Sequence, residues 1–529
     1  MVKTWLKTYL AEKFPELGFD VMVPPNSDMG DYSVNIPFAL AKKNGKNPME
    51  VGPSLVLELS ADTQLKEIFS VIVFAKPGFI NFTIDKNYIA REALKIAGGV
   101  IEVPKIGNKK INIEFVSANP TGPITFGNAR AGSYGDTLGN ILKCSGFEVA
   151  KEYYINDMGV QIKRLGESFY KKFLKNYKHQ EVEFGEDLYQ GEYVDVFVKK
   201  IVDDLGMQVA EGMSQDSWAM EAVEMMINGA RESMKNLGVM YDMWFYESDL
   251  HKNGEVNRAL QDLEASKNVF EKDGARWLKI DEEKSAVLVK GDGTTTYLMN
   301  DIAYSKNKFD RGFDHLINIW GADHHDAVPR LKAGVKAIGF NPDNLEVLLN
   351  QLVFIKKDGE LQRMSKRKGE FVLLDEMLNE VGKDAIRYFF LTKDLSTHME
   401  FDIDLAKEQS KKNPIYYIQY AFARIHSIFE KTGNATFESF EIQNESELSL
   451  SRHVIRFADV INDIALDYSV HHLAQYAYDL ATEFHKFYEK ERIIEEGKVN
   501  HNRLLLVAAV KNTLKKSLDL MGISSPEKM

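Results

Sequence analysis

The segment that most constrains the fold is a strand-like run that passes at once into a turn and then a helix. Residues 107–119 read GNKKINIEFVSAN, with alternating apolar side chains, and residues 120–132 read PTGPITFGNARAG, where proline and glycine precede a helical pattern. A buried strand that turns into a helix is the repeating unit of open parallel α/β sheets. We therefore expect a βα unit to begin near residue 107, with a helix N-terminus that can cradle a phosphate.

A single hydrophobic core cannot hold the whole chain. At 529 residues, two to four domains are expected. Hydrophobic residues make up 44% and charged residues 27%, which is typical of a soluble globular protein, and no apolar run is long enough to span a membrane. The single cysteine, Cys144, excludes an internal disulfide and favours a cytoplasmic location. The net charge of -12 argues against a general nucleic-acid coat protein but leaves room for local basic patches.

The hydrophobic pattern divides the chain into three parts. Residues 1–105 mix helix and strand patterns, and IFSVIVFAKPGFINFTI predicts two strands joined by a turn. Residues 106–395 hold the βα unit and two more apolar runs, HLINIWG and LEVLLNQLVFI, each expected to be one strand, with a mostly helical insertion at about 165–285. Residues 396–529 are nearly all helical in period and predict a helical bundle.

Polar residues follow two of the predicted strands, in SANPTGPITFGN and WGADHHD, and a third segment, RMSKRKGEF, is a basic glycine-containing loop. Ligands of open parallel sheets bind at the carboxyl ends of the strands, and phosphates need helix N-termini and mobile cations. Each segment alone is a weak signal. Their order and separation favour an enzyme that binds phosphates.

Several long stretches, in order, resemble the class I arginyl-tRNA synthetases. IEFVSANPTGPITFGNARAGSYGDTL resembles the segment with the HIGH motif, RMSKRKGEFVLLDEMLNEV the KMSKS region, KPGFINF the N-terminal added domain, and NPIYYIQYA the anticodon-binding helices. The resemblance implies a Rossmann-type, doubly wound parallel-sheet catalytic domain with a helical insertion, flanked by an N-terminal α/β added domain and a C-terminal helical-bundle anticodon-binding domain. The N-terminal domain would contact the outer corner of the tRNA.

The activity that this resemblance implies is ATP-dependent activation of L-arginine, with Mg²⁺ bound to the ATP, followed by transfer to tRNA(Arg). The protein is expected to be a cytoplasmic monomer without membrane contact. A synthetase for another amino acid is an alternative, against which the IEFVSAN and YLMND stretches argue.

The HIGH motif is altered. Thr125 and Asn128 stand where the family has its two histidines, whereas Gly127 is retained. Threonine and asparagine donate hydrogen bonds, but neither becomes cationic. Two hypotheses remain open at this point: a working variant of the site, or a tRNA-binding paralogue whose catalysis is weakened or lost. Compensation by a nearby cation such as Arg130 is also open.

The resemblance assigns the remaining site residues. A guanidinium has five donors and no acceptor, so its pocket needs carboxylates. Asp301 would pair with the guanidinium and Asn119 would hold the amino-acid backbone, and Tyr297 and Asp301 are four residues apart and so share a helix face. The full assignment is catalytic for Thr125, Asn128, Arg363 and Lys366; ATP-binding for Pro123, Gly127, Asp323, Met364 and Ser365; and arginine-binding for Glu114, Asn119, Tyr297, Asp301 and His324.

No metal site is predicted, because His324 and His325 would be adjacent on a strand and would point to opposite faces. Tyr416, Tyr420 and Phe487 are weak candidates for stacking on anticodon bases, since aromatic side chains among basic ones suit unpaired bases. The alternative for these aromatic residues is the core of the helical bundle.

Overall fold

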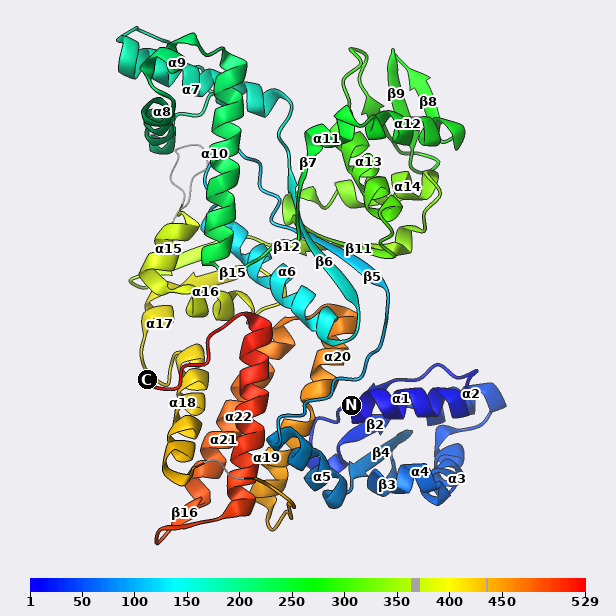
Figure 1. The fold of residues 1–529 in the computed structure, drawn as a ribbon. Helices are drawn as coiled ribbons and strands as arrows, with labels where there is room; N and C mark the ends of the chain where they lie inside the picture. The colour runs from blue at the N-terminus through cyan, green and yellow to red at the C-terminus, as the bar shows by residue number, and fades with distance from the viewer. Residues whose placement is uncertain (363–371, 434–435) are drawn as a thin grey trace.

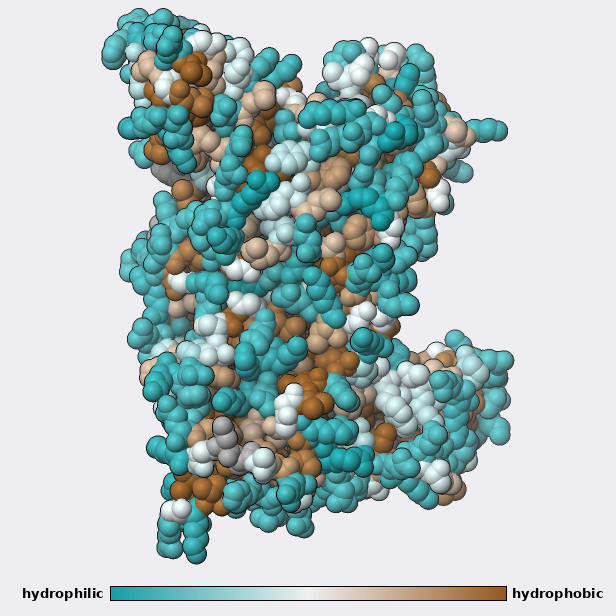
Figure 2. Space-filling view, viewed as in Figure 1, coloured by the Kyte–Doolittle hydropathy of each residue, from teal (hydrophilic) through white to brown (hydrophobic). Residues whose placement is uncertain are grey.

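The computed structural model describes residues 1–362, 372–433 and 436–529 (Figure 1). An N-terminal α/β domain and a C-terminal helical bundle lie below a central sheet, and two lobes rise above it. Figure 2 shows a hollow between these two lobes on the face drawn there. Along the described parts of the chain, no helix has the length and apolar character needed to cross a bilayer.

The N-terminal domain is a four-stranded antiparallel sheet of order β1-β2-β4-β3 with helices packed on it. The two strands predicted from IFSVIVFAKPGFINFTI are confirmed as β3 and β4, which pair directly. The elements are α1 (Val2–Lys13), β1 (Val21–Met22), η1 (Ser27–Met29), β2 (Tyr32–Val34), α2 (Ile36–Asn44), α3 (Pro48–Ala61), α4 (Thr63–Lys66), β3 (Phe69–Ala75), β4 (Phe79–Ile84) and α5 (Lys86–Ala97).

The central sheet has five parallel strands in the order β12-β11-β5-β6-β7. Its first strand along the chain, β5, runs through the predicted turn into α6, so the βα unit is confirmed. The chain then extends the sheet to one side with β6 and β7 and later to the other side with β11 and β12. The elements are β5 (Lys110–Phe115), α6 (Phe126–Cys144), β6 (Glu148–Ile155), β7 (Met243–Tyr246), β11 (His315–Gly321) and β12 (Leu345–Asn350).

Strand β5 is covered on both faces. Phe115 points to α6, where Gly135 lets it approach: a Cβ at that glycine would lie 2.4 Å from the Phe115 ring. Glu114, which points the other way, meets Lys308 of α13 (Tyr297–Asp310). Helices therefore lie on opposite faces of the strand, as a doubly wound sheet requires, and this explains the nearly continuous apolar run in its sequence.

The predicted insertion at about 165–285 is less uniformly helical than its sequence suggests. Its first part forms a helical lobe of α7 (Val160–Lys178), α8 (Glu192–Leu205), α9 (Met207–Gly212) and α10 (Gln215–Asn236), with Trp218 fully buried. The range also contains β7 of the central sheet and, near its end, most of an antiparallel sheet of β8 (Val269–Lys272), β9 (Ala275–Lys279) and β10 (Ser285–Val289), beside α11 (Glu247–Lys252) and α12 (Glu255–Ala265). Strands of four or five residues are too short to show a clear alternation.

The run LEVLLNQLVFI is two strands rather than the one expected. After β12 the chain leaves the central sheet, and β13 (Val353–Lys357) joins a small sheet of order β14-β13-β15. Strand β15 (Met399–Asp402) lies in the range assigned to the helical bundle, yet it pairs in parallel with β13. The other elements here are η2 (Ala322–His324), α14 (Ala327–Ala337), η3 (Pro342–Asn344), β14 (Glu360–Gln362), α15 (Leu374–Val381), α16 (Lys383–Phe390) and α17 (Ile403–Lys407).

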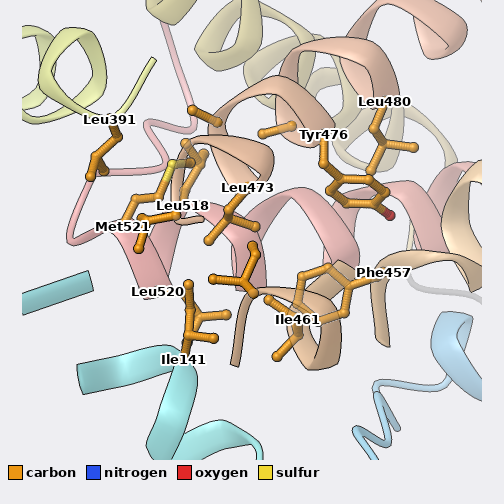
Figure 3. Close-up of a cluster of buried hydrophobic side chains, with 14 of the residues drawn as sticks. Ile141, Leu391, Phe457, Ile461, Leu473, Tyr476, Leu480, Leu518, Leu520 and Met521 are labelled. Atoms are coloured by element: carbon orange, nitrogen blue, oxygen red, sulfur yellow. The ribbon is translucent and has the colours of Figure 1, made fainter. Parts of the chain in front are cut away.

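The C-terminal bundle shares one apolar core with the central domain. In Figure 3, Met521 of the bundle lies near Leu391, and Leu520 lies near Ile141 of α6, and all four belong to one buried cluster. The bundle consists of α18 (Pro414–Thr432), α19 (Glu445–Ile455), α20 (Phe457–Asp467), α21 (His471–Lys490) and α22 (His501–Met521), with a hairpin of β16 (Ile494–Glu495) and β17 (Lys498–Val499).

A buried charged group joins the bundle to the sheet. Arg387 of α16 is fully buried, and its Nη2 donates to Asp136 Oδ2 of α6 at 2.6 Å. Its Nε donates to the carbonyl of Met521, at the end of α22, at 2.6 Å, and its Nη1 to the carbonyl of Leu237, just after α10. Asp136 also accepts from Lys151 Nζ at 2.6 Å. One guanidinium therefore ties α6, α10 and α22 together.

We expect Arg387→Met to lower the free energy of unfolding by about 3–5 kcal/mol, because it leaves buried polar partners unsatisfied. The matched control is Lys515→Met, which breaks an exposed pair with Asp519 on α22 and should cost less than about 1 kcal/mol. Denaturant unfolding of both variants measures the difference. Equal losses would contradict a central role for Arg387.

Candidate active site

The carboxyl ends of the parallel strands bring the candidate residues together. The strand order switches between β5 and β11, so the loop after β5 and the short helix η2 after β11 leave a shared edge in different directions. Such a switch point is where open α/β sheets bind their ligands. Two of the three segments singled out from the sequence, SANPTGPITFGN and WGADHHD, follow the strands that end at this edge, and the third, RMSKRKGEF, is approached only through its flanks.

The loop after β5 has an unusual backbone. Ser117 N donates to the carbonyl of Phe115 at 3.0 Å, and Val116 and Ser117 have φ angles of +70° and +39°. A three-residue turn with a β-branched residue in the left-handed region is strained. The Ser117 hydroxyl accepts from Tyr154 N at 3.0 Å, which continues the β5–β6 pairing through a side chain. Beyond this turn Asn119 is exposed, with its Nδ2 on Gln161 Oε1 at 3.0 Å.

Thr125 and Asn128 form a hydrogen-bonded pair at the start of α6. Asn128 Oδ1 accepts from the backbone N–H of Thr125 at 3.1 Å and from the Thr125 hydroxyl at 2.7 Å. Because a backbone N–H can only donate, the amide atom that faces it must be the oxygen, and Nδ2 is turned away. Within the described residues Nδ2 has no partner. The pair therefore leaves the two Asn128 Nδ2 protons available as donors, because the Thr125 hydroxyl proton is already donated to Asn128 Oδ1.

Gly127 lies between these two residues without being required by packing. A Cβ built there would meet only Thr125 Oγ1, at 4.0 Å. Since the described protein atoms leave space beside Gly127, that space is available to a ligand. Pro123 is half-buried in the same turn.

The Arg130 guanidinium is directed away from the start of α6. It is fully buried, and its guanidinium donates to three backbone carbonyls, those of Gln351, Asp394 and Thr397, at 3.2, 2.7 and 2.8 Å. Burial lowers its pKa to about 10. Its donors are therefore directed to the loops after β12 and α16 and not to the start of α6.

The basic loop is located only through its flanks. Arg363, Met364, Ser365 and Lys366 lie outside the described residues. The chain that follows, at Val372–Leu374, pairs with Ile124–Phe126: Phe126 N donates to the Val372 carbonyl at 2.8 Å and Leu374 N to the Ile124 carbonyl at 3.0 Å. The segment after the loop therefore lies directly beside Thr125.

Three carboxyl groups gather near the start of α13. Glu114 is buried and accepts from the fully buried Lys308 Nζ at 2.7 Å, and Lys308 also donates to Asn318 Oδ1 at 3.1 Å. Glu247, at the end of β7, is buried and accepts from Asn300 Nδ2 at 2.6 Å. Asp301 of α13 is half-buried, and the charges of both glutamates act on it.

Burial, and then the charges of Glu114 and Glu247, raise the pKa of Asp301 to about 8, while Lys308 opposes the shift. Burial also raises the pKa of Glu247. The hydroxyl of Tyr154 is buried nearby and faces Glu247. This acidic pocket holds more carboxylate than Lys308 neutralises, so it suits a cationic ligand with several donors.

The other predicted arginine- and ATP-site residues lie at an open rim. Tyr297 begins α13 and is 65% exposed, one helical turn before Asp301. Asp323 and His324 are exposed. Strand β11 ends at Gly321, so His324 and His325 lie in and after η2, and the argument that they alternate on a strand was wrong. Among residues 1–362, 372–433 and 436–529, no group of three potential ligands is placed to hold a metal ion.

Sequence reasoning missed Glu247 and Lys308. Glu247 follows β7 directly, so the rule that polar residues at strand ends mark a site would have found it had the short run MWFY been identified as a strand. Lys308 lies two helical turns beyond Asp301. In the sequence, a lysine in this helical run looks like an ordinary solvent-exposed side chain. Its pairing with Glu114 depends on a contact across 194 residues.

The aromatic candidates of the bundle separate by exposure. Tyr416 and Tyr420 are stacked on α18 with ring centroids 6.4 Å apart. Arg424 donates to the Tyr420 hydroxyl at 2.6 Å and lies 4.7 Å from the centre of that ring. Phe487 is 1% exposed, so no base can stack on it, and its burial removes it from the candidates.

Comparison with known proteins agrees with this arrangement. Three family models match: "Arginyl tRNA synthetase N terminal domain" over residues 2–84, "tRNA synthetases class I (R), catalytic domain" over 93–400 and "DALR anticodon binding domain" over 418–529. The chain is 42% identical over 534 residues to the arginine--tRNA ligase of Carboxydothermus hydrogenoformans, across 97% of this chain and 95% of that protein. It is 38% identical over 541 residues to that of Bacillus subtilis, across 99% and 97%.

The solved structure of Thermus thermophilus arginyl-tRNA synthetase superposes with a TM-score of 0.80 at 23% identity, covering 100% of both chains. The parallel sheet with its switch-point site is thus that of a class I aminoacyl-tRNA synthetase, and the predicted fold class is confirmed. With matches along nearly its whole length, the chain belongs to the arginyl-tRNA synthetase family.

The raised pKa of Asp301 predicts a dependence of stability on pH. Between its unfolded value, about 3.9, and about 8, the folded state holds a proton that the unfolded state lacks, so stability falls as pH rises through this window. Asp301→Asn removes the titration, and the stability of this variant relative to wild type should grow by up to about 1.4 kcal/mol per pH unit from pH 5 to 8. Unfolding free energies at pH 5, 6.5 and 8 measure it, with Asp343→Asn, an exposed aspartate of η3, as the surface control. If the difference in unfolding free energy between Asp301→Asn and wild type does not change with pH, the raised pKa of Asp301 is refuted.

Proposed function

We propose that the chain activates L-arginine with ATP and transfers it to tRNA(Arg). In the first step an arginine carboxylate oxygen attacks the α-phosphorus of ATP, which forms arginyl-adenylate and releases pyrophosphate. In the second a hydroxyl of the terminal tRNA adenosine attacks the arginyl carbonyl and releases AMP. The observation that carries this proposal is the acidic pocket of Glu114, Glu247 and Asp301 at the same switch point as the start of α6.

The arginine side chain enters the acidic pocket. Asp301 pairs with the guanidinium, whose charge would lower the carboxyl pKa from its raised value and so release the proton held in the empty pocket. Glu114 has one oxygen bound to Lys308, which leaves Oε1 without a partner in the described residues. Asn119 holds the amino-acid backbone, and Tyr297 and His324 close the exposed rim.

The ATP phosphates lie at the N-terminus of α6. Its N–H groups and the Asn128 amide donate to them, Gly127 and Pro123 leave room for the nucleotide, and Thr125 holds the Asn128 amide in place. Lys366 and Arg363 supply cations for the departing pyrophosphate, and Met364, Ser365 and Asp323 complete the nucleotide site. Mg²⁺ enters bound to ATP.

The tRNA spans the molecule. The N-terminal domain contacts its outer corner, and Tyr416 and Tyr420, backed by Arg424, stack on anticodon bases. The protein acts as a monomer in the cytoplasm.

The second candidate function, a tRNA-binding paralogue with weak or lost catalysis, follows from the two neutral side chains at the histidine positions. Two observations support a working site over a catalytically weak paralogue. Hydrogen bonds fix the Thr125–Asn128 pair in one orientation, and the acidic pocket is intact.

Charging of tRNA(Arg) with labelled arginine by the purified protein, with ATP and Mg²⁺, decides between the two functions. We expect charging that depends on arginine and is abolished by Asp301→Asn in protein that remains folded. Circular dichroism and tRNA binding serve as folding controls. Tight tRNA binding without charging by the wild type would establish the paralogue.

The Thr125–Asn128 pair makes a sharper prediction about chemistry. Asn128→Asp keeps the shape and the acceptor but replaces the amide donors with a charge that repels phosphate, so kcat of tRNA-dependent pyrophosphate exchange should fall by about 10²–10³. Thr125→Val removes only the orienting hydroxyl and should lower kcat by about three- to tenfold. Thr125→Ser is the matched control and should retain most activity. An Asn128→Asp variant as active as wild type would show that the amide does not contact the phosphates.

A further inference from the structure

Three tyrosine hydroxyls hold the loop that follows β5. Tyr241 donates to the carbonyl of Phe115 at 3.2 Å, Tyr153 to that of Ala118 at 3.0 Å and Tyr193 to that of Thr121 at 2.8 Å. The accepting carbonyls are spaced three residues apart along the chain. The three donors come from three different places: the segment after α10, strand β6 and helix α8.

This loop needs external partners because its own backbone provides few. The pairing of β5 with β6 and β11 ends by Phe115, and the next two residues adopt left-handed φ angles. Within the described residues, the backbone–backbone bonds that follow are short-range, from Ser117 N to the Phe115 carbonyl and from Thr121 N to the Asn119 carbonyl at 2.7 Å. A strained loop persists only where surrounding groups over-determine it. The tyrosine hydroxyls are such groups, and they flank Asn119.

Tyr193 differs from the other two because it belongs to the helical lobe. Its ring packs against the lobe core around Trp218, whereas its hydroxyl reaches across to the loop. Its ring tip also lies 3.7 Å from the position of a Cβ on Gly122. One side chain therefore links the position of α8 to the loop that carries Asn119.

We propose that Tyr193 is a positioning residue for the arginine site, which fixes the loop around Asn119 through its bond to the Thr121 carbonyl. This inference rests on the proposed role of Asn119 in binding the arginine backbone. Tyr241 holds the start of the loop at Phe115, Tyr153 its middle at Ala118, and Tyr193 its end at Thr121, just before the turn into α6. Without the Tyr193 hydroxyl, the loop can relax from its strained form and Asn119 loses its alignment.

The test compares Tyr193→Phe with Tyr476→Phe. Tyr476 is buried in the bundle, and its hydroxyl donates to the His453 carbonyl at 2.8 Å, so the control loses the same kind of bond far from the loop. For Tyr193→Phe we expect KM for arginine in tRNA charging to rise about three- to tenfold with kcat within about twofold. The unfolding midpoint should shift no more than that of the control. Tyr476→Phe should leave KM unchanged.

Two further measurements separate this proposal from the proposed activity. Calorimetry with L-arginine should show a higher Kd for Tyr193→Phe. Amide hydrogen exchange should be faster in the peptide covering residues 112–125. Neither readout needs turnover. A second variant, Gly191→Ala, keeps a permitted backbone angle of φ −58°, but its Cβ would lie 2.7 Å from the Tyr193 ring. It should shift Kd and KM in the same direction.

Each outcome bears on one claim. Equal KM, Kd and exchange for Tyr193→Phe and wild type would overturn the positioning role while charging stands. A loss explained by unfolding, equal in both phenylalanine variants, would reduce Tyr193 to a structural residue and also overturn it. A wild type that binds arginine but does not charge tRNA would refute the activity, and the Kd and exchange differences would still decide the role of Tyr193.

Discussion

The parallel pairing of β5 with strands on both of its sides is the constraint on which the rest of this molecule depends. Because β5 is hydrogen-bonded to β6 and to β11, its carboxyl end lies at the centre of the sheet, where the strand order switches. Its alternating side chains contact two helices, one on each face of the sheet. Phe115 packs on α6, whose start offers phosphate donors, and Glu114 faces α13, which carries Asp301. A single strand thus places the two halves of the site next to each other.

The charges around that strand follow two different rules. At the end of the sheet near the bundle, two buried cations, Lys151 and Arg387, share the carboxylate of Asp136, and Arg387 also donates to backbone carbonyls. At the carboxyl end Lys308 pairs with Glu114 and acts on Asp301, whereas Glu247 accepts from the neutral amide of Asn300. Burial raises the pKa of both Asp301 and Glu247, so this pocket favours protonated carboxyl groups when it is empty and suits a cationic ligand.

The sequence predicts the architecture well, and the site only where its signals are local. The βα unit at residue 107 and the β3–β4 hairpin could be found because turn residues and apolar periods lie within a dozen residues of each other. Strand β7 was missed because four residues carry no readable period, and Glu247 was missed with it. The Lys308–Glu114 pair and the Tyr193 bond to Thr121 join residues that are far apart in the chain, and no local pattern encodes them. Phe487 was wrongly assigned to base stacking for a related reason. An aromatic residue on an amphipathic helix looks the same in sequence whether it faces a base or the core.

Under the proposed function, the fixed geometry of the Thr125–Asn128 pair replaces part of a charge. A neutral amide attracts phosphate less strongly than an imidazolium does. An amide that is already oriented before the substrate arrives, however, spends less free energy on reorganisation when it binds. Here the backbone N–H and hydroxyl of Thr125 both hold Asn128 Oδ1, so rotation of the amide would break two bonds. The positive end of the α6 dipole adds a fixed partial charge at the same place. Because none of these donors titrates between pH 5 and 8, this half of the site keeps its hydrogen-bonding character across that range, whereas the acidic pocket carries the raised pKa values of Asp301 and Glu247.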